Sequence, residues 1–276
     1  MKSWKIIIKK SLYYSFAIVT GISTIASILG YSLKDLFKNH EIMKSSLTLI
    51  IAFLIVSSII ILIQFVLNHK GFTTIINGKE ITIRNANIFT VPGLKVIPFN
   101  ERFDTKVDDI VISHDSLNGI MIDNYVTNID DLNNEIKLAF DEKVELAPIK
   151  KKNTIIYPLG RIIKYNDFLM LAMSHFDKQN QAYIHINEYE SMLTNMWYEI
   201  RRVYAGKKIV IPLIGSGITT MTGIKEKNNT MLLKCMLCTL KRSRFQPKNG
   251  ITIVLTDEAM NSIEMVKIKE EFKSDI

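Results

Sequence analysis

The chain has 276 residues, of which 47% are hydrophobic and 22% are charged, and its formal net charge is +8 at pH 7. The hydrophobic share is high for a wholly soluble protein, and the excess is confined to two stretches near the N-terminus. No basic run with interleaved aromatic residues is present, so we expect no nucleic-acid partner despite the positive charge.

Two stretches without a charged residue, 12–31 and 47–67, come first along the chain. Each has about 20 residues, the length that crosses a bilayer as a helix. We therefore interpret residues 1–70 as a transmembrane helical hairpin. The first stretch also has the layout of a signal peptide. The second is too long and apolar for a surface strand and shows no amphipathic pattern, which argues against that alternative.

Lysine residues indicate how this hairpin is oriented. More of them flank its outer ends than lie in the connecting loop: Lys2, Lys5, Lys9, Lys10, Lys70 and Lys79 against Lys34, Lys38 and Lys44. Because cytoplasmic segments carry the excess of positive charge, we predict a multi-pass protein of the inner membrane with both termini in the cytoplasm.

From Gly71 onward, short β-rich runs alternate with helical ones. The predicted strands lie within 80–89, 94–99, 108–113, 153–159, 181–186, 208–215 and 250–256. The predicted amphipathic helices are 129–140, 188–204 and 227–245. This alternation predicts a three-layer α/β domain over residues 71–276, with a mixed, mainly parallel sheet.

Cys235 and Cys238 form a C-x-x-C motif within the last of these helices. No second paired motif of Cys or His is present to complete a metal site. Met231, Leu232 and the two cysteines fall on one helical stripe. We therefore predict a packed, reduced helix face and no metal.

The stretch IVIPLIGSGITTMTG, residues 209–223, predicts a buried strand that opens into a glycine-containing loop. Ligands of parallel α/β sheets bind outside the carboxyl ends of the strands, and the backbone N–H groups of such loops bind phosphate. The loop is not a Walker A motif, because no Gly-Lys-Ser/Thr follows. It is not a Rossmann fingerprint either, because a third glycine at the required spacing is missing. A structural turn without a ligand is the alternative.

Several stretches resemble macro domains, the ADP-ribose-binding α/β modules. IVIPLIGSGIT (209–219) is similar to the family's second ligand loop, and IVISHDSLNGIM (110–121) to the loop before its first helix. NANIF (85–89) followed by KVIPFNERFDT (95–105) is similar in order and spacing to its early strands. Together with the two apolar stretches, VIPFNERFDT and SLNGIMIDNY resemble the membrane-anchored macro-domain effectors of Thoeris anti-phage defence systems.

This resemblance implies a set of ligand-binding residues. The diphosphate would be wrapped by Gly215, Ser216, Gly217, Ile218 and Thr219, and the other side of the ligand closed by Leu117, Asn118 and Gly119. Asn100 would bind the distal ribose, with Asp104 and Thr105 in the same pocket. Turn formation and helix capping are the alternative roles of Asn100 and Asp104.

The expected adenine contact departs from the family pattern. Many macro domains carry an Asp in a Gly-Asp-Ile stretch that accepts a hydrogen bond from the adenine amino group, whereas this chain has Ala86-Asn87-Ile88. An Asn carbonyl accepts the same bond without charge assistance. We therefore expect Asn87 and Ile88 at the adenine.

The resemblance implies an anti-phage defence effector. In that account a TIR-domain partner consumes NAD and makes an ADP-ribose-derived signal, such as histidine-ADP-ribose, which the macro domain binds. The two spans then assemble into a homo-oligomer in membrane lipid and disrupt the membrane. Ala17 and Gly21, small residues four apart, permit close helix packing, although chance accounts for them as well.

The alternative function is enzymatic, a membrane-tethered hydrolase of ADP-ribosyl groups or ADP-ribose esters. The candidate catalytic groups are His114, Asp115, His185 and Glu188. No Ser or Cys nucleophile is matched to a base, so we expect a binding module with no catalytic residue. A third alternative is a membrane scaffold with an empty pocket, which predicts no ligand binding.

Overall fold

The computed structural model describes residues 2–28, 42–69, 71–141, 146–151 and 154–273. The chain divides into two compact units, Met1–Lys70 and Gly71–Ile276. Of the loop expected between the two apolar stretches, Lys34 and Lys38 lie outside the described residues, whereas Lys44 lies in the helix Ile42–His69 rather than in a loop.

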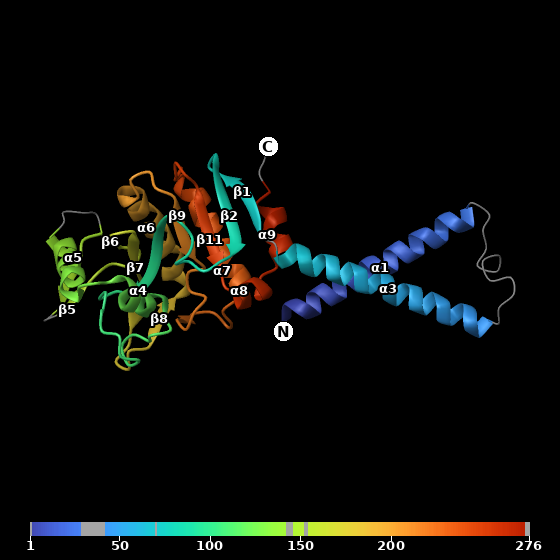
Figure 1. Ribbon diagram of the computed structural model, residues 1–276, viewed down its shortest axis with the longest axis horizontal. Helices are drawn as coiled ribbons and strands as arrows, with labels where there is room; N and C mark the ends of the chain where they lie inside the picture. The colour runs from blue at the N-terminus through green and yellow to red at the C-terminus, as the bar shows by residue number, and fades with distance from the viewer. Residues whose placement is uncertain (1, 29–41, 70, 142–145, 152–153, 274–276) are drawn as a thin grey trace. The chain divides into compact units, whose positions relative to one another are not determined.

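The N-terminal unit consists of helices α1 (Lys2–Ile28) and α3 (Ile42–His69), which lie against each other (Figure 1). Ser15 and Ser57 are buried, whereas large apolar side chains of both helices, such as those of Phe16 and Leu62, are exposed.

A membrane crossing requires one helix with about 20 consecutive apolar residues. Among the residues whose placement is described, no helix is both long enough and apolar enough to meet that requirement. This finding overturns the expected transmembrane spans over 12–31 and 47–67 and the expected localisation in the inner membrane.

The second unit is built on a mixed sheet in the order β1-β2-β11-β9-β3-β7-β8-β10, with β6 also paired to β7. Its strands are β1 (Phe72–Ile76), β2 (Lys79–Asn85), β3 (Leu94–Asn100), β6 (Ile162–Tyr165), β7 (Phe168–Phe176), β8 (Ala182–His185), β9 (Ile209–Pro212), β10 (Thr220–Thr222) and β11 (Ile251–Leu255). The central strands β2, β11, β9, β3 and β7 are parallel to their neighbours in this row. Antiparallel strands flank this central group. Strand β1 pairs with β2, and both β6 and β8 pair with β7. A separate pair is formed by β4 (Ile149–Lys151) and β5 (Thr154–Ile156).

Helices cover both faces of the sheet, which gives the predicted three layers (Figure 1). One core cluster contains buried side chains of α6 (Ile186–Val203), α7 (Asn229–Ser243), α8 (Asp257–Ser262) and α9 (Met265–Glu271). The other contains those of α4 (Leu117–Tyr125) and α5 (Ile129–Asp141). A sheet with helices on both faces places its ligands at strand ends rather than on a face.

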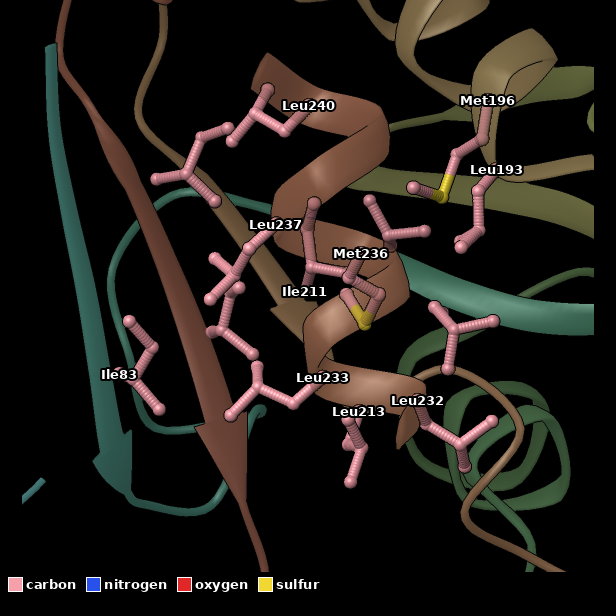
Figure 2. Close-up of a cluster of buried hydrophobic side chains, with 14 of the residues drawn as sticks. Ile83, Leu193, Met196, Ile211, Leu213, Leu232, Leu233, Met236, Leu237 and Leu240 are labelled. Atoms are coloured by element: carbon pink, nitrogen blue, oxygen red, sulfur yellow. The ribbon is translucent and has the colours of Figure 1, made fainter. Parts of the chain in front are cut away.

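Helix α7 illustrates how the larger cluster forms. Its buried side chains recur at helical spacing: Leu232, Leu233, Met236, Leu237 and Leu240. Figure 2 shows them between the sheet, represented by Ile83 and Ile211, and helix α6, represented by Leu193 and Met196. Each such side chain contributes about 1.5–3 kcal/mol when fully buried. The helix begins at the N-cap Asn228, whose side chain accepts hydrogen bonds from the N–H groups of Thr230 and Met231.

The C-x-x-C motif belongs to the same helix. Cys235 and Cys238 are both free thiols, partly buried and packed against the core cluster. Burial raises the pKa of each thiol. The predicted packed helix face is therefore confirmed.

Most of the predicted elements of this unit are present, but β1, β4, β6, β7, β10, α8 and α9 lie outside the predicted ranges, and two of the predicted strands differ. No strand covers 108–113, where only an isolated bridge joins Val107 to Ile112. Within 153–159 the strand is limited to Thr154–Ile156. Strand β7 was not predicted, because its first seven residues are all buried and the resulting apolar run has no alternation.

Candidate functional site

Three segments that carry predicted site residues leave the sheet at one edge. Strand β11 runs parallel to β2 and β9, and β3 runs parallel to β9. The carboxyl ends of β2, β9 and β3 therefore share the edge at which ligands of parallel α/β sheets bind. Asn87 follows β2, the loop 213–219 follows β9, and Asn100 is the last residue of β3.

The two glycines of the loop 213–219 differ in what they allow. Gly215 has a φ of +82°, and a Cβ there would lie 3.3 Å from Cε2 of Tyr189. Gly217 has no positive φ, and a Cβ built on it would meet no atom within 4 Å. The loop conformation thus requires glycine at 215, whereas Gly217 leaves open space beside the backbone.

Internal hydrogen bonds close the base of this loop. The N–H and Oγ of Ser216 donate to the carbonyl oxygen of Leu213 at 3.2 and 2.8 Å, and Oη of Tyr189 donates to that of Ile214 at 2.7 Å. Within the described part of the chain, the N–H groups of Gly217 and Ile218 donate no hydrogen bond. The tip of the loop therefore presents N–H groups that a ligand can use.

Lys227 contacts the other side of the loop, and the sequence analysis did not single it out. Its Nζ donates to the carbonyl oxygens of Gly217 at 2.5 Å and Thr219 at 2.9 Å. Burial lowers the pKa of this ammonium below its usual value of 10.5. One feature of the sequence could have indicated Lys227. It directly precedes Asn228, the N-cap of α7, so it lies at the amino-terminal end of that helix.

The predicted adenine contacts follow strand β2. Asn87 is exposed, and its Oδ1 accepts the N–H of Phe89 at 2.9 Å, which forms a local turn. Ile88 is buried in the smaller core cluster. The structure thus uses the Asn87 side-chain oxygen within the protein, and Ile88 packs inward rather than toward solvent.

The predicted ribose contacts form a turn after strand β3. Asn100 is 2% exposed; its Oδ1 accepts the N–H groups of Arg102 and Asp104, and its Nδ2 donates to Oδ2 of Asp104 at 3.0 Å. Thr105 donates to Oδ1 of Asn133 in α5 at 2.9 Å. These hydrogen bonds match the turn-forming alternative, and they direct Thr105 to α5 rather than to the loop 213–219.

Leu117, Asn118 and Gly119 form the first turn of α4. The N-cap Ser116 accepts the N–H of Gly119 and donates to Oδ1 of Asn118 at 2.6 Å. A Cβ at Gly119 would lie 2.1 Å from the carbonyl oxygen of Ser113. Glycine is therefore required for the close approach of the preceding loop.

Three of the candidate catalytic groups, His114, His185 and Glu188, have structural partners. His185 is the N-cap of α6 and forms a capping box with Glu188. The exposed His114 ring contacts Oδ2 of Asp123 at 2.6 Å, and this hydrogen bond raises the pKa of the imidazole. In the described residues, neither histidine contacts a Ser or Cys side chain that would act as a nucleophile.

A histidine that the sequence analysis missed lies at the carboxyl end of β7, beside the end of β3. Nδ1 of His175 is 2.5 Å from Oε2 of Glu101, and Nε2 is 3.3 Å from Oε1 of Glu188. The hydrogen bond with Glu101 is the main cause that raises the pKa of the ring. A protonated imidazole with both nitrogens on carboxylates has no lone pair with which to accept a proton.

Two cavities lie away from the loop 213–219. One of about 370 Å³ is lined by residues of α5, β6 and the end of α6, among them Leu138, Ile163 and Arg202. Strand β6 pairs with the amino-terminal half of β7, so this cavity does not open at the carboxyl edge. A hollow of about 310 Å³ lies between the turn 102–105 and α5, and Asp104 and Thr105 are among its lining residues.

The sequence of this chain is similar to those of known proteins. The family model described as Thoeris protein ThsA, Macro domain, matches residues 81–256. The Thoeris protein ThsA of Bacillus amyloliquefaciens (strain Y2) is 38% identical over 230 residues, which cover 78% of this chain and 75% of that protein.

Solved structures of the Oceanobacillus iheyensis macrodomain are also similar. One, a mutant, is 14% identical, covers 73% of this chain and 97% of its own, and has a TM-score of 0.46. Another, with ADP, is 13% identical, covers 73% of this chain and 96% of its own, and has the same TM-score.

Proposed function

The chain belongs to the Thoeris ThsA macro-domain family, and on that premise we propose that it is an anti-phage defence effector whose α/β domain binds an ADP-ribose-derived signal. The signal is made from NAD by a TIR-domain partner, and histidine-ADP-ribose is the conjugate that we expect. The domain acts as a binding module rather than as an enzyme.

The observation that carries this proposal is the geometry of the loop 213–219. It lies at the carboxyl edge of the sheet, and the N–H groups of Gly217 and Ile218 are not used within the protein. Open space beside Gly217 allows a phosphate to approach the backbone closely. An anion bound there receives hydrogen bonds that replace those of water.

The remaining ligand contacts follow from the shared edge. The adenine would lie near Asn87 and the distal ribose near Asn100, with Leu117, Asn118 and Gly119 on the other side. The Asn87 and Asn100 side chains both take part in internal turns. Both amides retain hydrogen-bonding capacity for a ligand, because Oδ1 of the exposed Asn87 has a second lone pair and Nδ2 of Asn100 has a second N–H besides the one that donates to Asp104.

We further propose that binding of the signal promotes self-association through the N-terminal unit. Helices α1 and α3 expose large apolar side chains, including Tyr13, Phe16, Ile22 and Leu62. Exposed apolar surface of this kind is typical of an interface, and a second copy of the same helices is the proposed partner. The signal can shift the equilibrium from the resting to the assembled state only by the difference between its binding free energies for the two states. It must therefore bind the assembled state more tightly.

The hydrolase alternative requires a group that can accept or donate a proton at the ligand. His175 is the histidine at the carboxyl edge, and both of its ring nitrogens face carboxylates. These contacts hold both ring nitrogens on protein carboxylates rather than at a ligand, which favours the binding module.

Thermal unfolding of the full-length protein with a panel of ligands tests the proposal. We expect ADP-ribose and histidine-ADP-ribose to raise the Tm in a concentration-dependent manner, because ligands that bind the native state stabilise it by mass action. Both compounds should be recovered intact after incubation. Turnover would establish the hydrolase instead, and unchanged Tm with every compound would establish an empty pocket.

A further inference from the structure

The loop 213–219 has two chemically different sides, and Lys227 occupies one of them. Its Nζ donates to the carbonyl oxygens of Gly217 and Thr219. In a trans peptide the C=O of one residue and the N–H of the next point in opposite directions. With the Gly217 carbonyl turned to Lys227, the N–H of Ile218 points to the opposite side of the loop.

The ammonium of Lys227 is partly removed from water without a compensating carboxylate. It takes part in none of the ion pairs found among the described residues. Burial without such a partner lowers the pKa of the ammonium. An anion bound at the loop would supply the missing negative charge.

The position of Lys227 is fixed by the packing of α7. The Asn228 side chain caps this helix immediately after Lys227, and Leu232 is fully buried in its first turns (Figure 2). The Cδ atoms of Leu232 would lie 3.7 and 3.8 Å from a Cβ at Gly215. The start of α7 therefore packs on the base of the loop, so the ammonium needs little reorganisation to act on it.

We propose that Lys227 is a positioning residue of the phosphate site: it ties two carbonyl oxygens to one side of the loop, aims the Ile218 N–H at the other side, and compensates the charge of a phosphate bound there. This role rests on the proposed function, and it identifies Lys227 as a residue through which the domain recognises the phosphates of the ligand. It distinguishes ligands that carry a diphosphate from nucleosides without one.

The test uses the full-length protein with two probes, ADP-ribose and adenosine, and three variants. Lys227→Met removes the charge and both hydrogen bonds, Lys227→Arg keeps the charge, and Lys225→Met makes the same charge change at an exposed neighbouring residue. We expect Lys227→Met to weaken ADP-ribose binding at least tenfold and adenosine binding less than twofold. Lys227→Arg should recover part of the loss, and Lys225→Met should change binding less than twofold.

The pH profile provides a readout that a merely structural lysine would not move. A bound anion favours the protonated ammonium, so it raises the pKa of Lys227. Wild-type affinity for ADP-ribose should therefore fall between neutral pH and about pH 10, with proton uptake on binding. Lys227→Met should lack this dependence. Where Lys227→Met fails to fold, Lys227→Arg provides the comparison, because its guanidinium stays charged throughout this range and should also lack the dependence.

Three results would overturn the inference while leaving the proposed function in place: equal ADP-ribose affinity of wild type and Lys227→Met, equal loss of ADP-ribose and adenosine binding, or a flat wild-type pH profile. Failure of the wild-type protein to bind ADP-ribose and its histidine conjugate would reject the proposed function and the inference together.

Discussion

The phenol Oη of Tyr189 in helix α6 donates a 2.7 Å hydrogen bond to the carbonyl oxygen of Ile214, and both residues are fully buried. Burial raises the pKa of this phenol well above 10, so it remains a donor at physiological pH. The hydrogen bond ties α6 to the base of the loop 213–219.

Replacing Tyr189 with Phe leaves the Ile214 carbonyl buried without this donor. We expect the free energy of unfolding to fall by about 1–3 kcal/mol and ADP-ribose binding to weaken several-fold, because the loop loses a fixed point. Urea denaturation and calorimetry measure the two effects. Tyr157→Phe is the matched control, since Tyr157 donates to Ile136 in α5 at 2.6 Å and not to the loop. It should lower stability without changing affinity.

The two loop glycines should respond differently to substitution. Gly217→Val places its side chain in open space, so we expect unchanged stability but ADP-ribose binding weakened by more than about 1.4 kcal/mol, tenfold in Kd. Gly215→Val forces a side chain into a positive φ and against Tyr189. It should lower stability by about 1–3 kcal/mol or more. Normal ADP-ribose affinity in a folded Gly217→Val variant would move the phosphate site elsewhere.

A buried ion pair joins the residue that precedes β6 to α6. NH1 of the fully buried Arg161 lies 3.0 Å from Oε2 of Glu199, which is 1% exposed. Glu199→Gln removes a buried carboxylate charge that faces the Arg161 guanidinium, so we expect about 3–5 kcal/mol of destabilisation by urea denaturation. Glu271→Gln makes the same chemical change in an exposed pair with Lys234. It should alter stability by less than about 1 kcal/mol, and equal effects of the two substitutions would contradict this assignment.

His175 should make stability depend on pH. Because its pKa is raised in the folded protein, its contribution is fully present below the usual value of 6.5 and is lost as the pH rises through the raised value. We therefore expect the difference in free energy of unfolding between wild type and His175→Gln to be larger at about pH 5.5 than at about pH 9. A difference that does not change with pH would show that the ring is not charged in the native state.

The sequence predicted the second unit well because its strands and helices carry clear periodicity. The buried stripe of α7 and the position of the glycine loop after β9 follow from residue type and spacing alone. Strand β7 was missed because a strand covered on both faces has no alternation, and 108–113 was misassigned because an apolar run in a loop has the same composition as a strand.

The candidate site was harder to predict, because its side chains meet through the fold. No local sequence pattern connects the residues that meet there. Lys227 contacts Gly217 and Thr219, and His175 contacts Glu101 and Glu188. Asn100 was placed at the correct end of β3, but its partners in the turn could not be read from its residue type. The membrane expectation rested on composition and length and was overturned by the helices described.

Hydrogen–deuterium exchange of the full-length protein, followed across residues 213–220 with and without ADP-ribose, tests the central claim most directly. The unbonded N–H groups of Gly217 and Ile218 should exchange rapidly in the free protein and become protected at saturating ligand, because they donate to the diphosphate. Residues 164–169 at the β6–β7 turn, which lie beside the amino-terminal end of β3, should show no change. Saturating ADP-ribose that protects another region and leaves residues 213–220 unchanged would contradict the account.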